Sequence, residues 1–193
     1  MELRNIAVAV AIALLVAGCG CAPVPPPTPA PTSRAFDLTL RVEGSPNATA
    51  TQTVRAAEQR LESFITADLP DVPNTKGLRC AGRALNSPSK VDDLFVAVRF
   101  VDIDGPKGVL AGAGPCQVRG GSRLPITGLI EIDLADVGPL IKAGQLDETI
   151  LHEMTHVLGF GSIWTDKGLL RNPKTSSVQF TGAKANAAWR TLG

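Results

Sequence analysis

The chain has 193 residues, enough for one ordinary domain together with further segments. Its 19 Lys and Arg against 18 Asp and Glu give a formal net charge of +1 at pH 7, which argues against nucleic acid as a partner and against strong electrostatic steering. Aromatic residues make up only 4%, whereas there are 19 Gly and 15 Pro, so the composition predicts a turn-rich α+β domain.

The N-terminal residues predict export. Arg4 precedes an apolar run over residues 6–16, which is too short for an ordinary membrane span. The tetrapeptide that ends in Cys19, VAGC, resembles the lipobox of bacterial lipoproteins, in which the cysteine is lipidated and becomes the new N-terminus. We therefore expect a signal peptide over residues 1–18 and a protein held at the bacterial cell envelope, outside the cytoplasm. A plain secretory signal or an uncleaved anchor is the alternative.

Residues 19–33 combine the lipidated Cys19 with a proline-rich stretch, APVPPPTPAPTS. Such a stretch forms an extended polyproline-type spacer that does not pack into a core. We interpret it as a linker between a membrane and the folded domain, which we place at residues 34–193. The membrane contact of the protein is thus expected to run through its N-terminal lipid.

The first half of this domain shows three clear elements. Residues 36–42 alternate between apolar and polar and predict a strand. Asn47 or Thr49 is placed to cap a helix that continues to about residue 67. Residues 94–103 are almost continuously apolar, which predicts a strand at the centre of a sheet.

The second half begins with a glycine-rich stretch over residues 105–121, which is either a flexible loop or an irregular strand with bulges. Residues 126–134 alternate and predict another strand, exposed on one face. Residues 136–143 form a short helix or a turn, and residues 145–158 form an amphipathic helix. This order fits a small mixed sheet with helices packed on it.

Cys80 and Cys116 are the two cysteines of the domain. In an exported protein an even pair of cysteines predicts a disulfide. A zinc site at either cysteine is the weaker interpretation, because neither has another cysteine or a histidine at ligand spacing.

The helix over residues 145–158 carries the sequence LHEMTHVLGF, which contains both histidines of the chain, His152 and His156. Residues four apart lie on the same face of a helix, so the two imidazoles can bind one Zn²⁺. Glu153, between them, is placed to act as general base toward a water molecule without being a zinc ligand. Gly159 stands where a left-handed turn would end the helix. An accidental match to a five-residue pattern is the alternative.

A catalytic zinc site requires a third protein ligand. The compact pattern H-E-x-x-H-x-x-G-x-x-H would place a histidine at position 162, which is Ser162. The only carboxylate after His156 is Asp166, a weak candidate because a lone loop aspartate is more often solvated.

The sequences HEMTHVLGFGSIW (152–164), GLLRNP (168–173) and FTGAKANAAW (180–189) resemble the bacterial relatives of leishmanolysin, the M8 family of metzincin peptidases. GPC (114–116) and LPITGLIEID (124–133) are similar to that family as well. The resemblance implies a metzincin-like fold, with a twisted mixed sheet, an antiparallel edge strand that aligns a peptide, and a zinc helix beneath it.

By that resemblance His152 and His156 are zinc ligands, Glu153 is the catalytic base, and residues 126–134 are the substrate-aligning edge strand. It also implies an insertion before the third histidine, so that Ser162 is compatible with the family. The chain ends at Gly193, and we therefore expect the N-terminal part of such an enzyme, truncated before the third zinc ligand and with the C-terminal subdomain missing.

Two functions follow as expectations. The first is a zinc-dependent endopeptidase that hydrolyses a peptide or protein substrate with metal-activated water. The alternative is a catalytically inactive, membrane-anchored lipoprotein that serves as a binding or structural module. We also expect an uncovered apolar patch after the zinc helix, unless its residues fold back on the sheet. The residues of this patch are Phe160, Ile163, Trp164, Leu169 and Leu170.

Overall fold

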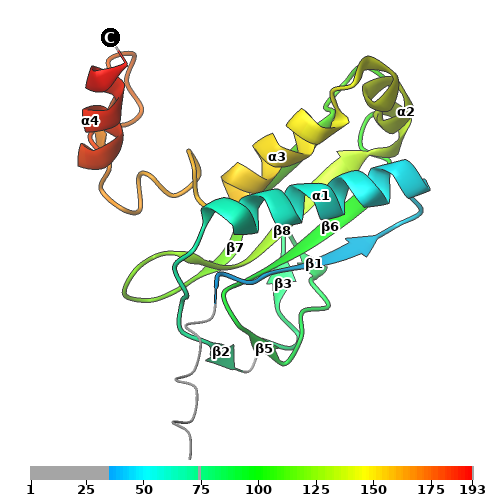
Figure 1. Ribbon diagram of the computed structural model, residues 1–193, viewed down its shortest axis with the longest axis horizontal. Coiled ribbons are helices and arrows are strands. Elements are labelled where there is room, and N and C mark those ends of the chain that lie inside the picture. The colour runs from blue at the N-terminus through cyan, green and yellow to red at the C-terminus, as the bar shows by residue number, and fades with distance from the viewer. Residues whose placement is uncertain (1–34, 74, 193) are drawn as a thin grey trace, which may run out of the picture. The chain divides into compact units, whose positions relative to one another are not determined.

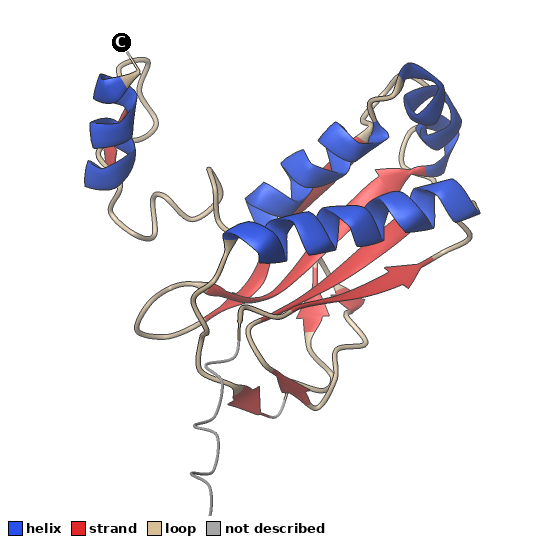
Figure 2. Ribbon diagram, viewed as in Figure 1, coloured by secondary structure: helices blue, strands red, loops and turns tan. Residues whose placement is uncertain are grey.

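The computed structural model describes residues 35–73 and 75–192; the expected signal peptide, Cys19 and the proline-rich linker lie outside the described residues. The described part is an α+β fold built on a mixed four-stranded sheet (Figures 1 and 2). The strands follow the order β1-β6-β8-β7 and comprise β1 (Leu38–Glu43), β6 (Leu94–Val101), β8 (Pro125–Asp133) and β7 (Ala111–Val118). β1, β6 and β8 are parallel, whereas β7 runs antiparallel to β8.

Helices cover one face of this sheet (Figure 1). They are α1 (Ala48–Phe64), α2 (Leu134–Ala143) and α3 (Leu146–Val157). Asn47 caps α1 as expected, because its side-chain oxygen accepts a hydrogen bond from the Ala50 N–H at 2.8 Å. A fourth helix, α4 (Ala183–Thr191), follows near the C-terminus. Within the described ranges, no helix combines the length and the apolar character that crossing a membrane requires.

The expected central strand is confirmed. β6 lies between β1 and β8, and every residue from Leu94 to Phe100 is buried. Its successive side chains point to opposite faces of the sheet and belong to two separate apolar clusters, one under the helices and one on the opposite face. A strand buried on both faces needs apolar residues in succession rather than in alternation, which explains the continuous run in the sequence.

The expectation that residues 126–134 form an edge strand exposed on one face is wrong. β8 is an interior strand, and most of its residues are buried. The edge strand is β7, which comes from the glycine-rich stretch and is an irregular strand rather than a flexible loop. The pairing of β7 with β8 shifts between Pro115 and Gln117, so that Cys116 is the extra residue of a bulge.

Short two-residue strands form hairpins and pairs outside the main sheet. They are β2 (Val72–Pro73) with β5 (Lys90–Val91), β3 (Arg79–Cys80) with β4 (Arg83–Ala84), and β9 (Leu170–Arg171) with β10 (Gln179–Phe180). The structure joins Cys80 to Cys116 in a disulfide, with the two Cα atoms 5.3 Å apart. The bulge of β7 is therefore tied covalently to the β3–β4 hairpin.

Asp133 fixes the junction between β8 and α2. Its buried carboxylate accepts hydrogen bonds from the backbone N–H groups of Asp104, Ala135 and Gly105 at 2.9–3.0 Å. These bonds, that from Asp104 foremost, hold the pKa of Asp133 below its ordinary value although burial acts in the opposite direction. Because this cap precedes Leu134, the expected helix over residues 136–143 begins two residues earlier. α2 ends at Gly144, which has φ +67°.

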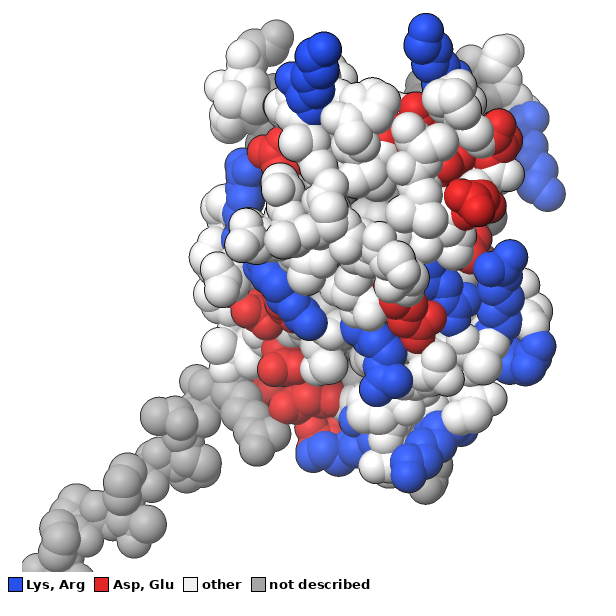
Figure 3. Space-filling view, turned by 90° about the vertical axis from the view of Figure 1, so that its right-hand side faces the viewer, with Lys and Arg blue, Asp and Glu red and all other residues white. Residues whose placement is uncertain are grey.

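Charged side chains of both signs lie on the face of the molecule drawn in Figure 3. On the face drawn in Figure 3, Lys and Arg lie among Asp and Glu, as the near-zero net charge predicts.

Candidate metal centre

The helix that carries the histidines is held close to the sheet. Its apolar stripe consists of Leu146, Ile150, Met154 and Val157, and all four are buried in the core beneath the helices. A β-carbon added at Gly128 of β8 would lie 2.2 Å from a methyl group of Val157, so only glycine permits this approach. α3 is thus a rigid platform whose opposite side faces solvent. Its observed bounds agree with the predicted helix to within one residue at each end.

The two histidine rings converge on that open side. His152 Nε2 and His156 Nε2 are 3.0 Å apart, and the ring planes are inclined at 86°. Two nitrogen ligands at 2.0–2.1 Å from a tetrahedral zinc ion would be about 3.3 Å apart. The observed separation therefore requires only a small adjustment of the rings to admit the ion. His152 is exposed and His156 is half-buried, so the pair is accessible from solvent.

A backbone carbonyl fixes the tautomer of His156. Its Nδ1 lies 2.9 Å from the Phe160 oxygen, and because a carbonyl can only accept, Nδ1 must carry the hydrogen. Nε2 then presents a lone pair toward His152, as a zinc-ligating histidine does. Gly159, with φ +105°, makes the turn that brings this carbonyl back to the ring. The expected left-handed end of the helix is thereby confirmed.

Glu153 lies beside the pair without competing for its nitrogens. The residue is only 8% exposed, and no hydrogen-bond partner of its carboxylate is found within residues 35–73 and 75–192. It lines a cavity of about 420 Å³ between the start of β7 and α3. The other lining residues are Leu110, Ala111, Glu148, Thr149 and His152. His152 and Glu153 therefore line the same cavity.

Of the expected ligand side chains, the described residues bring only His152 and His156 together. Asp166, the weak candidate for a third ligand, pairs instead with Arg123, whose nitrogen lies 3.4 Å from its carboxylate. Among the described residues, no third His, Cys, Asp or Glu completes a ligand cluster around His152 and His156. The two imidazoles fit zinc in type, convergence and orientation, and the remaining positions would require donors from elsewhere, such as water.

An acidic cluster that no sequence pattern indicated lies far from these histidines in the chain. Carboxylate oxygens of Asp68, Asp92 and Asp93 lie within 4.8 Å of one another. Asp93 is fully buried, and its two oxygens accept from the backbone N–H groups of Asp37 and Leu69. Asp93 thus has a structural role in holding the start of β1, a role that its position just before β6 does not reveal.

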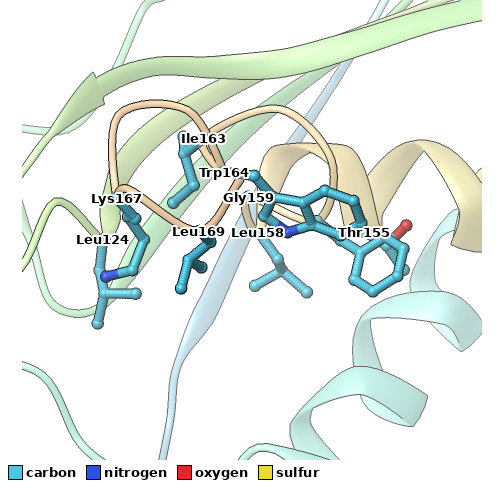
Figure 4. Close-up of a pocket in the computed structure, with 9 residues that line it drawn as sticks. Leu124, Thr155, Leu158, Gly159, Ile163, Trp164, Lys167 and Leu169 are labelled. Carbon is cyan, nitrogen blue, oxygen red and sulfur yellow. The ribbon is translucent and has the colours of Figure 1, made fainter. Parts of the chain in front are cut away.

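The expected apolar patch is only partly present. Phe160 is 63% exposed, whereas Ile163 is 5% exposed and packs into the space left by the missing side chain of Gly159. The prediction that Ile163 would be uncovered is therefore wrong. Trp164 and Leu169 are half-buried and line an apolar pocket of about 370 Å³ beyond the end of α3 (Figure 4). Leu124 and Lys167 also line this pocket, and neither was assigned to a site from the sequence.

The chain has no match among protein-family models or among curated proteins.

Proposed function

We propose that the chain is a zinc-dependent endopeptidase of the leishmanolysin-like, metzincin type, anchored through a lipid on Cys19 at the bacterial cell envelope. The observation that carries the proposal is the convergence of two histidine Nε2 atoms, 3.0 Å apart, with Glu153 beside them. This arrangement matches the H-E-x-x-H motif, in which two imidazoles bind the metal and the carboxylate acts as general base.

When bound, zinc would supply Lewis acidity that polarises a peptide carbonyl and favours ionisation of water. His152 and His156 would hold it through Nε2, while the Phe160 carbonyl keeps His156 in the required tautomer. Glu153 would accept a proton from the attacking water and return it to the leaving amine. Its lack of a described partner leaves both carboxylate oxygens available for that transfer.

The edge of β7 offers a place for the peptide backbone. Asp133 N–H donates to the Leu110 oxygen at 3.0 Å, so Leu110 belongs to a hydrogen-bonded pair with β8. Pairs alternate along an antiparallel ladder, and the N–H and C=O groups of Ala111 and Ala113 therefore point outward. An extended peptide can add to such an edge. Because Ala111 also lines the cavity of His152 and Glu153, a peptide bound there would pass these residues.

The alternative function, a catalytically inactive binding module, is favoured by the count of ligands. Two histidines hold zinc more weakly than three, and the described residues provide no third ligand next to them. In that case the edge of β7 would bind peptides without cleaving them.

Zinc titration and peptide hydrolysis by the full chain distinguish these functions. We expect one zinc ion per chain, loss of binding in His152→Ala, and retained binding with loss of hydrolysis in Glu153→Gln. Glu148→Gln is the matched control, since Glu148 lines the same cavity five residues earlier on α3. Hydrolysis by Glu153→Gln at the wild-type rate would falsify the assigned base. Zinc binding without hydrolysis of any peptide in a diverse library would support the inactive module.

A further inference from the structure

Two glycines of β7 leave a groove on the face of the sheet that lies away from the helices. The neighbours of Glu131 in β8 belong to the core under the helices, so Glu131 projects to the opposite face. Its partner across the ladder is Gly112, and the partner of Leu129 is Gly114. Within the described chain, no heavy atom other than those of chain neighbours lies within 4 Å of a β-carbon added at either glycine. No side chain of β7 therefore stands between Glu131 and the free edge of the sheet.

A cavity of about 380 Å³ occupies this groove. Glu131 lines it, and so do Leu129, Pro115 and the disulfide-bonded Cys80. The cavity thus combines apolar walls with one carboxylate. Such a combination suits a long side chain that has a methylene stem and a charged end, because the stem can pack while the charge is paired.

The carboxylate of Glu131 is paired with a cation but not hydrogen-bonded to it. Arg83 of the β3–β4 hairpin places a nitrogen 3.6 Å from Glu131 Oε1, and the side chain of Arg83 is 61% exposed. This distance exceeds that of a charge-assisted hydrogen bond. Oε1 is buried and has no hydrogen-bond partner among the described residues, so its capacity to accept is unused. An ion pair with so exposed a cation contributes little, and Arg83 can therefore be displaced by a better donor.

We propose that this groove is a subsite for a basic side chain, arginine or lysine, of a peptide bound along β7. The subsite rests on the proposed function, in which an extended peptide pairs with the outward groups of Ala111 and Ala113. The peptide residues opposite Gly112 and Gly114 then direct their side chains to the same face as Glu131. Neighbouring strands lie about 4.8 Å apart, so the peptide backbone lies two such spacings from β8. Only a long side chain that crosses the glycine reaches the carboxylate.

Other side chains fit the groove less well. A long apolar side chain would fill the cavity but leave Oε1 of Glu131 without a donor, which is costly for a buried acceptor. An acidic side chain would be repelled by Glu131, and a short polar one would not span β7. The groove therefore selects for both length and positive charge.

Binding of paired peptides to the full chain tests the subsite without requiring hydrolysis. The probes are two short, fluorescein-labelled peptides rich in Thr and Val. They differ at one central position, which is arginine in one peptide and its uncharged isostere citrulline in the other. Fluorescence anisotropy is measured in the Glu153→Gln background with zinc present. We expect the arginine peptide to bind about tenfold more tightly, as a charge-assisted hydrogen bond allows.

Variants of the groove identify its parts. Glu131→Gln should abolish the preference for arginine, whereas Asp147→Asn, which removes an exposed carboxylate from α3, should keep it. Gly112→Val should also abolish the preference by filling the crossing, and it should fold, since its β-carbon meets open space. Arg83→Gln should instead strengthen binding of the arginine peptide by up to about fivefold, because it removes the competing cation.

Binding of neither peptide, equal binding of both, or a preference that survives Glu131→Gln or Gly112→Val would overturn the subsite. An equal loss of preference in Asp147→Asn, or weaker arginine binding in Arg83→Gln, would overturn it as well. Cleavage of both peptides by the wild-type chain at equal rates would support the endopeptidase and count against the subsite. A tenfold preference in binding without any cleavage would support the subsite and favour the inactive binding module.

Discussion

Gly159 offers a sharp test of how the turn after α3 organises the candidate metal centre. Its φ of +105° is a conformation that an alanine adopts only with strain, which costs about 1–3 kcal/mol. The added β-carbon would also lie 2.5 Å from the Cδ1 atom of Ile163, and this side chain would have to move. We therefore expect Gly159→Ala to lower the free energy of unfolding in urea by about 1–3 kcal/mol or somewhat more.

The same substitution should also lower the affinity of the chain for zinc. Displacing the turn moves the Phe160 carbonyl, which accepts from His156 Nδ1 at 2.9 Å. Loss of such a supporting hydrogen bond typically weakens metal affinity about 10–100-fold. Zinc affinity would be measured by competition with a chromophoric chelator, under conditions in which the variant remains folded.

Gly112→Ala is the matched control for both measurements. Gly112 lies in β7 without a positive φ, and no atom lies within 4 Å of the position of its added β-carbon. Alanine there should be neutral or stabilising by up to about 1 kcal/mol. If Gly159→Ala were as stable as Gly112→Ala, the strain argument would be refuted. If it were destabilised but bound zinc with wild-type affinity, the Phe160 carbonyl would have no part in the site.

Further predictions concern the sheet and its surroundings. Replacing Cys80 and Cys116 by serine opens a loop with a sequence separation of 36 and should cost about 4 kcal/mol of unfolding free energy, measured in denaturant under oxidising conditions. Asp133 has a lowered pKa in the folded state, so its stabilising contribution is present above the unfolded pKa of about 3.9 and disappears as pH falls through the folded pKa. Asp133→Asn should therefore reduce the acid dependence of stability, and an unchanged pH profile would contradict this cause. Gly128→Val should destabilise the fold by pushing Val157 and α3 off the sheet, with a lowered melting temperature as the readout.

The sequence allowed the long elements and the histidine pair to be predicted because both depend on local spacing. The run LFVAVRFV in β6 required burial on two faces, and the alternation in β1 matched a strand with one buried face. The i, i+4 spacing of His152 and His156 placed both rings on one side of α3. These features follow from the geometry of a single helix or strand.

The position of each strand in the sheet depends on contacts between distant segments and was predicted less well. The alternation in residues 126–134 suggested an exposed face, but β8 is covered on one side by helices and on the other by the second apolar cluster, which lies on the sheet face opposite the helices. The edge strand β7 could not be assigned from the sequence, because its glycine-rich residues do not show the alternation of apolar and polar side chains that predicts a strand. Two features of the turn after α3 were likewise not predictable, because they form only in the folded chain. Ile163 packs against Gly159, and His156 donates a hydrogen bond to the Phe160 carbonyl.

Pro115 has a consequence for self-association of the protein. Exposed sheet edges recruit strands from neighbouring molecules, and this is a common route to aggregation. Pro115 occupies an outward-facing position of β7, where its missing N–H leaves the ladder to β8 intact but interrupts any strand added from outside. The bulge at Cys116 follows at once. The free edge is therefore long enough for a short segment of backbone and too short to template the growth of a sheet from one molecule to the next.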